Sequence, residues 1–243
     1  MNRHQNTSGF SLMETMIVLV IVLSITAAIF QTINMTTQRS TTEQVKLDMF
    51  QEAREFMDQM ARDLRQAGYP NIHNMDYTVL SSVQSPLIND YRFAAGLIEV
   101  SKTDLWFEGD VDNSGTVSVV RYYLDTSTTN GCPCLRRSQA AKANGDPLSN
   151  TSFTYQVEVQ GVQNTTTDGI FSAYNNGTAV TLPVDISTSS GATIAGVDTV
   201  QAVLSLQAAT IDPQTRTYPT TTLVTTVRMN NCSQAAIGYK TSC

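Results

Sequence analysis

The chain has 243 residues, a formal net charge of −6 and 41% hydrophobic residues. This length and composition suit one apolar anchor followed by one globular domain. The acidic balance, together with the lack of a basic run or zinc-finger spacing, argues against nucleic acid as a partner.

The N-terminal segment contains an apolar stretch, residues 10–30, in which Glu14 is the only ionisable residue. About 20 apolar residues are enough for a helix to cross a bilayer. A secretory signal would place its small-residue cleavage site after such a stretch, whereas Ser8 and Gly9 precede it. Cleavage after Gly9 would therefore leave the membrane helix attached to the chain.

The residues Gly9-Phe10-Ser11-Leu12-Met13-Glu14 resemble the class III leader junction of type IV pilins and type II secretion pseudopilins. Those families end the leader at a glycine, begin the mature chain with a methylated phenylalanine and keep a glutamate as its fifth residue. The resemblance implies cleavage between Gly9 and Phe10 and N-methylation of Phe10. It also implies that Glu14 acts in assembly, by pairing with the free amine of Phe10 on a neighbouring subunit.

The same residues fit a second interpretation, a capping box at the start of an ordinary anchor helix. In it, the Ser11 hydroxyl accepts a free backbone N–H and the Glu14 side chain reaches back to the cap. The capping box leaves the Gly9–Phe10 step unexplained. An acid inside a membrane segment is, moreover, a functional residue by default.

A single long helix is predicted after the leader, because no proline or glycine lies between Phe10 and Ala67. At 1.5 Å per residue it would be about 85 Å long. Its second half carries an apolar stripe at steps of three or four residues, which we expect to pack on a sheet. The stripe consists of Val45, Met49, Ala53, Phe56, Met60, Leu64 and Ala67. Arg65 and Gly68 mark the helix end, and a coiled-coil stalk is the alternative to packing on a sheet.

The sequence at the end of the helix indicates which of these families the chain resembles most. Residues 56–69 are similar to the type IV pilus assembly protein PilW family, in which an Ala-Arg-Asp-Leu-Arg-x-Ala-Gly-Tyr pattern closes the helix. The J-type minor pseudopilin of type II secretion shares the Asp-Leu-Arg ending, but Gly68-Tyr69 favours the pilus. Many major pilins have a proline in the membrane helix, and its absence here argues against a role in the body of the filament.

Beyond Tyr69, turn-forming residues separate short runs of β-branched and aromatic residues, which is typical of a mainly β domain. We predict a hairpin from strands at 104–107 and 117–124, with a third strand at 135–137. Later strands are expected at 153–159, 170–174, 178–182, 200–206 and 222–229. The last two alternate in polarity, and their apolar faces should pack against the helix stripe. These faces comprise Val200, Ala202, Leu204 and Leu206, then Leu223, Val227 and Met229.

The predicted fold is therefore α+β and type IV pilin-like, with a long N-terminal helix packed on an antiparallel sheet. Residues 1–9 form the leader and 10–33 the transmembrane and assembly part of the helix. Residues 34–68 form its amphipathic part, and 69–243 a β-rich head with a C-terminal cysteine loop. Arg3 in the leader favours the cytoplasmic side, which places the head in the periplasm.

The loop at 110–115 matches the first half of a calcium-binding loop, with Asp110, Asp112 and Ser114 as ligands. The second half of the loop does not match, because Arg121 occupies the position at which a bidentate acid is required. The nearest carboxylates that could complete the site are Glu108 and Asp125. An ordinary hairpin turn is the favoured interpretation, since Asp, Asn and Gly all suit tight turns. No other cofactor is predicted.

Four cysteines follow the membrane segment in what should be an oxidising compartment: Cys132, Cys134, Cys232 and Cys243. Zinc is disfavoured because Cys132-Pro133-Cys134 is tighter than the usual spacing and only His73 could supply an imidazole. The family resemblance implies a closed C-terminal region and hence a Cys232–Cys243 bond. Cys132 and Cys134 would then form a short-ring pair or remain free thiols.

An enzyme is the alternative from another functional class. His73 would have to serve as its base, and no nucleophile elbow, phosphate loop or zinc motif accompanies it. We therefore predict a protein without catalytic residues.

The resemblance implies a minor pilin that primes type IV pilus assembly at or near the tip. The alternatives are a J-type minor pseudopilin and, more remotely, a membrane-anchored periplasmic binding domain. Its implied partners are other minor pilins, the major pilin, the prepilin peptidase, the inner-membrane platform protein and a tip adhesin. The chain would cross the inner membrane once, through residues 10–30, before joining an extracellular pilus that serves motility, DNA uptake or adhesion.

Overall fold

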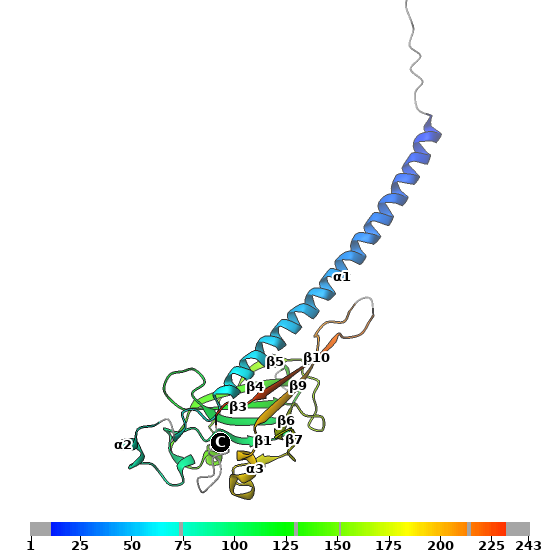
Figure 1. Cartoon of the computed structure of the whole chain (residues 1–243). Coiled ribbons are helices and arrows are strands. Elements are labelled where there is room, and N and C mark those ends of the chain that lie inside the picture. The colour runs from blue at the N-terminus through cyan, green and yellow to red at the C-terminus, as the bar shows by residue number, and fades with distance from the viewer. Residues whose placement is uncertain (1–10, 73–74, 129–130, 151, 213–214, 232–243) are drawn as a thin grey trace, which may run out of the picture.

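The computed structural model describes residues 11–231 except 73–74, 129–130, 151 and 213–214. Its dominant element is helix α1 (Leu12–Gln66), a continuous helix of 55 residues. At 1.5 Å per residue, α1 is about 80 Å long. Its first half extends away from the rest of the chain and its second half lies along a β-rich head (Figure 1). The prediction of one long helix is confirmed.

The end of α1 is fixed by a close contact with the sheet. Ala67 leaves the helical conformation, and Gly68 adopts a positive φ of 83°. Ala67 forms an isolated β-bridge with Gly109. A Cβ atom at Gly109 would collide with the carbonyl oxygen of Gln66, so this approach requires glycine.

The described part of the head contains two antiparallel sheets. The larger has the order β5-β4-β3-β2-β1-β8, and the smaller the order β10-β9-β6-β7. The strands of the larger sheet are β1 (Leu97–Val100), β2 (Asp104–Gly109), β3 (Ser118–Asp125), β4 (Cys134–Ala141), β5 (Gln156–Gln160) and β8 (Val184–Asp185). Those of the smaller sheet are β6 (Phe171–Asn175), β7 (Thr178–Ala179), β9 (Thr199–Gln207) and β10 (Thr220–Arg228). The α+β class and the β2–β3–β4 meander are thus confirmed.

Short helical turns complete the described part of the head. They are α2 (Tyr77–Leu80), α3 (Ala192–Ala195), η2 (Leu87–Asn89), η4 (Pro147–Ser149) and η5 (Thr188–Gly191). These turns and strands β1 and β8 were not predicted from the sequence. Strand β8 has only two residues, too few for an alternating pattern to be recognised.

The core lies between the second half of α1 and the two sheets. Residues Ala53, Phe56, Met60 and Leu64 of the stripe are buried, as are Val200, Ala202, Leu204 and Leu206 of β9. Among the strands, α1 contacts β10 most extensively and also touches β2, β5 and β9. The prediction that the stripe packs on the sheet is confirmed. Because strands of the same chain cover the stripe, it is not available to pack against a second helix in a coiled-coil stalk.

Candidate functional site

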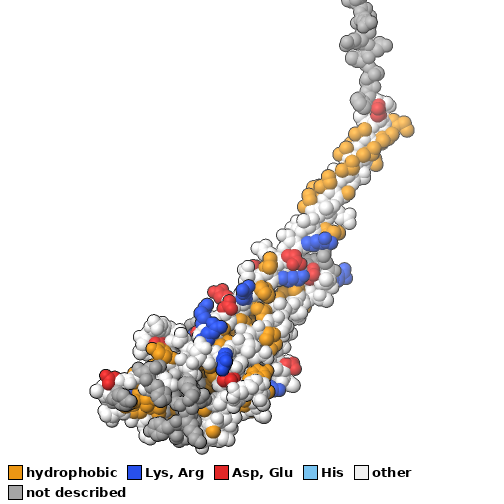
Figure 2. Space-filling view, in the orientation of Figure 1, with side chains coloured by type: hydrophobic (Ala, Val, Ile, Leu, Met, Phe, Trp, Pro, Cys, Tyr) orange, Lys and Arg blue, Asp and Glu red, His pale blue; other side chains and the backbone are white. Residues whose placement is uncertain are grey.

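The apolar side chains of the free half of α1 are exposed, and Figure 2 shows many of them on the face in view. Leu12 is 78% exposed, Val20 65% and Phe30 62%, although such residues belong in a protein core. An 18-residue window of this helix has a mean hydropathy of 2.5, and none of that window is buried. Among the described residues, α1 is the one helix long and apolar enough to cross a membrane. By length and composition, the segment is therefore suited to a membrane anchor or a signal sequence.

The hydroxyl side chains inside this segment form local hydrogen bonds. The hydroxyls of Thr15, Ser24, Thr26 and Thr32 each donate to a backbone carbonyl three or four residues earlier, at 2.8–2.9 Å. Such bonds matter in lipid, because no water is present there to accept from a free hydroxyl. The segment can thus enter a bilayer without leaving these donors unpaired.

Glu14 lies in the first turn of α1 and is exposed. Its backbone N–H, like that of Thr15, donates to the Ser11 carbonyl, at 3.0 and 3.2 Å respectively. Its carboxylate has no hydrogen-bond or ion-pair partner among residues that the structure describes. The capping box is not formed, because the Ser11 side chain makes no capping bond. The acid is therefore available to a group outside the described part of the chain.

Several predicted site residues lie outside the described residues. They are Gly9 and Phe10 at the cleavage and methylation site, His73, and the cysteines Cys232 and Cys243. Predictions about their processing, pairing and chemistry stay predictions.

A buried polar cluster joins α1 to the larger sheet. The Tyr122 hydroxyl donates to Asp63 Oδ2 at 2.7 Å, and Arg137 Nη2 donates to the same oxygen at 2.8 Å. Burial, reinforced by the charge of Asp63, raises the pKa of Tyr122 well above its ordinary value. The Tyr122 ring also meets Phe56 edge-on, with centroids 5.5 Å apart. The cluster fixes the last turns of the helix against strands β3 and β4.

A second buried ion pair joins the sheet to the loop before β1. Lys142 Nζ donates to Glu108 Oε2 at 2.6 Å and to the carbonyls of Ile88 and Phe93, both at 2.8 Å. Burial raises the pKa of Glu108, and the charge of Lys142 opposes that rise. These contacts attach residues 88–95 to the strand layer.

Neither cluster was predicted from the sequence. Asp63 offered a signal, because it lies on the buried face between Met60 and Ala67, where an acid needs a partner. Lys142 offered none, since its three acceptors come from segments that are remote in sequence.

The loop proposed for calcium has the geometry of a hairpin turn. The backbone N–H groups of Ser114 and Gly115 donate to the two carboxylate oxygens of Asp110, both at 2.9 Å. The Ser114 N–H also donates to Asp112 at 3.1 Å, and hydrogen bonds from Ser114 lower the pKa of Asp112. Asn113 and Gly115 have positive φ angles of 56° and 80°. The carboxylates therefore stabilise their own turn.

The two carboxylates named as the nearest candidates to complete a calcium site each pair with a cation of the chain. Glu108 binds Lys142. Asp125 lies at the opposite end of β3 from the loop, with Oδ2 2.9 Å from Arg136 Nε. The length of β3 separates Asp125 from the loop, and Lys142 holds the Glu108 carboxylate.

Cys132 and Cys134 form a disulfide, the short-ring alternative rather than free thiols. Both are buried, and Arg136 Nη2 lies 3.6 Å from Cys132 Sγ. The Asp125 carboxylate is near the two sulfurs. Because the sulfurs are bonded to each other, they do not act as thiolate ligands for a metal in this state.

The described chain is thus an α+β protein with one long apolar N-terminal helix, suited to a membrane anchor or a signal sequence, and two antiparallel sheets. Comparisons with protein-family models, with curated proteins and with solved structures each gave no match. A functional assignment therefore depends on the N-terminal sequence and on the geometry described above.

Proposed function

We propose that this protein is a PilW-like minor pilin that takes part in priming and assembling a type IV pilus, at or near its tip. The observation that carries the proposal is Glu14. It is the only acid in the apolar half of α1, it follows the Gly9-Phe10 step, and its carboxylate has no partner among the described residues.

An ionised carboxylate such as that of Glu14 is costly to place in lipid. An acid at the centre of a membrane helix costs about 2.5–3.5 kcal/mol on insertion scales, and less near the helix end. A free amine at residue 10 of an adjoining subunit would offset this cost by forming an ion pair. Lateral association of helices then becomes favourable where the two groups meet. The exposed apolar side chains around Glu14 would pack against neighbouring helices in the same assembly.

The layout of the chain supports the rest of the proposal. The head lies at one end of α1, so that the free half can enter the membrane or a helical filament core while the head remains in water (Figure 1). In this proposal the head faces the periplasm before assembly and the cell exterior afterwards. The partners are other minor pilins, the major pilin, the prepilin peptidase, the platform protein and a tip adhesin.

The test is a deletion strain scored in parallel for surface pili and for secretion of folded exoproteins. We expect fewer pili, restoration by the native chain, and poor restoration by Glu14→Ala despite normal processing at Gly9. Glu55→Ala is the matched control, because it removes an exposed acid from the same helix outside the apolar half. Its complementation should equal that of the native chain.

Other outcomes separate the alternatives. Intact pili with exoproteins retained in the periplasm would support the J-type pseudopilin instead. Normal piliation together with normal secretion would overturn both assembly proposals and leave the anchored binding domain.

A further inference from the structure

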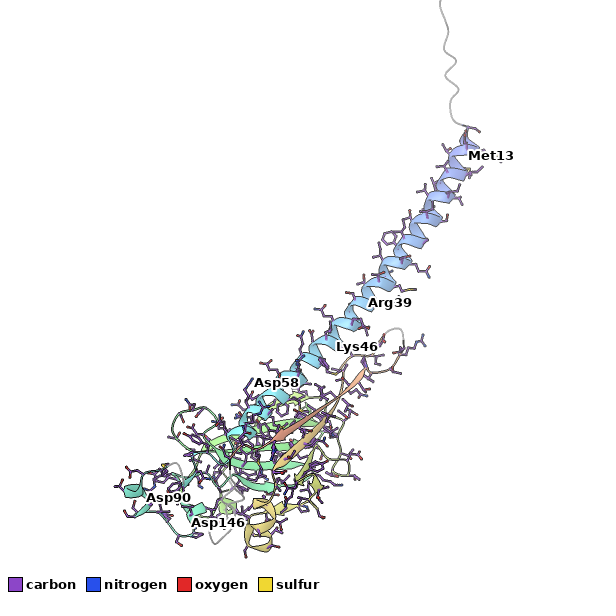
Figure 3. The ribbon with its side chains drawn as sticks, in the orientation of Figure 1. Met13, Arg39, Lys46, Asp58, Asp90 and Asp146 are labelled. Atoms are coloured by element: carbon purple, nitrogen blue, oxygen red, sulfur yellow. A yellow bond between two sulfur atoms is a disulfide. The ribbon has the colours of Figure 1, made fainter. Side chains whose placement is uncertain are left out.

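The hairpin that joins β9 to β10 extends along α1 toward the apolar half of the helix (Figure 1). Near the end of this hairpin, Asp212 Oδ1 accepts a hydrogen bond from the Thr42 hydroxyl of α1 at 3.4 Å, and both residues are buried. On the helix, this contact lies between Arg39 and Lys46, which are labelled in Figure 3. The end of the hairpin therefore lies beside the helix just beyond its apolar half.

The position of the hairpin end is fixed by Asp212. The Asp212 N–H donates to the Thr217 carbonyl at 2.9 Å, and the Arg216 N–H donates to the Asp212 carbonyl at 2.8 Å. The Thr215 hydroxyl donates to Asp212 Oδ2 at 3.0 Å. One buried acid thus closes the turn and attaches it to α1.

The length of α1 places this contact at the level of the lipid headgroups. No ionisable residue lies between Glu14 and Arg39. From Glu14 to Arg39 the helix rises about 38 Å, whereas the hydrocarbon layer of a bilayer is about 30 Å thick. With the two charges at equal depth in the two headgroup layers, Arg39 lies about 4 Å outside the hydrocarbon, and Thr42 about 4.5 Å farther along the axis. The hairpin end then lies in the outer part of the headgroup layer.

The exposed side chains at the hairpin end suit such a layer. Ile211 is 49% and Tyr218 45% exposed, on either side of the turn. Arg216 in the turn and Arg39 on α1 are also exposed, and among the described residues neither guanidinium has an ion-pair or hydrogen-bond partner. Tyrosine is enriched at the membrane–water interface, and a guanidinium binds phosphate oxygens through two parallel hydrogen bonds.

The acids at this level do not neutralise the two arginines. Glu43 pairs with Lys46 at 3.2 Å. Asp212 is buried and accepts from two hydroxyls. Asp48 lies about 9 Å farther along α1 than Thr42, toward the head. Arg39 and Arg216 are therefore free to bind an anionic group.

We propose that the end of the β9–β10 hairpin docks on the headgroup layer of the bilayer that α1 enters. Arg39 and Arg216 bind lipid phosphates, and Ile211 and Tyr218 contact the interface. The contact sets the rotation of the head about the axis of α1. This inference rests on α1 as a membrane anchor and not on a role in pilus assembly.

The experiment measures tryptophan quenching in the full chain, reconstituted in phosphatidylcholine–phosphatidylglycerol nanodiscs that contain a nitroxide lipid. A nitroxide on the headgroup should remove most of the emission added by Tyr218→Trp, after subtraction of the Trp106 emission of the native chain. Tyr91→Trp is the control, because it changes an exposed tyrosine beside Asp90, at the end of the head remote from Met13 (Figure 3). Its emission should be retained.

A variant inside the apolar half separates failure of the anchor from failure of the contact. A nitroxide at the bilayer centre should quench Ile25→Trp, since residue 25 lies near the middle of the uncharged stretch. Quenching at residue 25, with no more quenching at residue 218 than at residue 91, would overturn the inference alone. No quenching at residue 25 would overturn the membrane anchor as well.

A charge reversal tests the role of the arginines. Loss of one cation near a lipid surface should weaken the contact about fivefold, so Arg216→Glu should restore much of the Tyr218→Trp emission in the presence of the headgroup nitroxide. Arg228→Glu makes the same charge change at an exposed position at the other end of β10, and should leave the quenching unchanged. Undiminished quenching with Arg216→Glu, or an equal effect of Arg228→Glu, would overturn the inference.

Discussion

A substitution in the buried polar cluster tests directly how the helix is held to the head. The cluster consists of Asp63, Tyr122 and Arg137. Asp63→Ala removes the acceptor for the Tyr122 hydroxyl and for two Arg137 nitrogens. Breaking a buried ion pair by removing one partner costs about 3–5 kcal/mol. The Arg137 side chain is 13% exposed, so we expect a loss near the lower end, about 3 kcal/mol. For a chain of this size, that corresponds to a decrease in Tm of about 6–12 °C.

The assay is thermal and denaturant unfolding in detergent, followed by the fluorescence of Trp106, the only tryptophan of the chain. Trp106 is buried in β2 and reports on the head rather than on the free half of α1. Asp58→Ala is the control, because its pair with Arg54 is exposed on the same helix at 4.0 Å. Such pairs contribute about 0.5 kcal/mol or less. The reasoning would be refuted if Asp63→Ala were no more destabilising than Asp58→Ala.

Three further predictions concern processing, disulfides and pH. Intact-mass analysis should find a mature chain that begins at Phe10 and carries one added methyl group; recovery of Met1 would contradict the pilin proposal. Peptide mapping without reduction should find the bonds Cys132–Cys134 and Cys232–Cys243. Any bond between the two pairs would contradict this predicted pairing. Because burial raises the pKa of Tyr122, its contribution to stability should be complete below pH of about 10 and decrease above it, a decrease that Tyr122→Phe should abolish.

The parts of the fold that could be predicted are those whose causes are local in sequence. The uninterrupted helix follows from helix-forming residues without proline or glycine, and the strands at 104–109 and 118–125 flank a recognisable turn. The stripe at 53–64 could be matched to a sheet because its period places every member on one face. The partner strand β10 was identified for the same reason, since the inward residues Leu223, Thr225 and Val227 alternate with more exposed ones.

The parts that could not be predicted depend on contacts between remote segments. Glu108 was considered only as a calcium ligand, because its neighbours in sequence form an acidic loop. Its actual partner, Lys142, is brought to it by the pairing of β3 with both β2 and β4. A pocket beside them likewise requires the folded position of residues 142–150, which no spacing in the sequence specifies.

The contrast between Asp63 and Glu14 carries the functional argument further. Both acids lie on α1, but Asp63 has one cation, Arg137, and one hydroxyl donor, Tyr122, within the chain, whereas Glu14 has no partner among the described residues. If the chain is a solitary membrane anchor, Glu14→Gln should make the free energy of membrane insertion of the monomer more favourable, by up to about 2.5–3.5 kcal/mol. It should have no unfavourable effect on association. In an assembly subunit, the same substitution should improve insertion and weaken subunit association, because it removes the partner of the neighbouring amine. Improved insertion together with weakened association would follow only if the acid is needed for association. Measuring both quantities on the Glu14→Gln variant therefore separates an anchor from an assembly subunit.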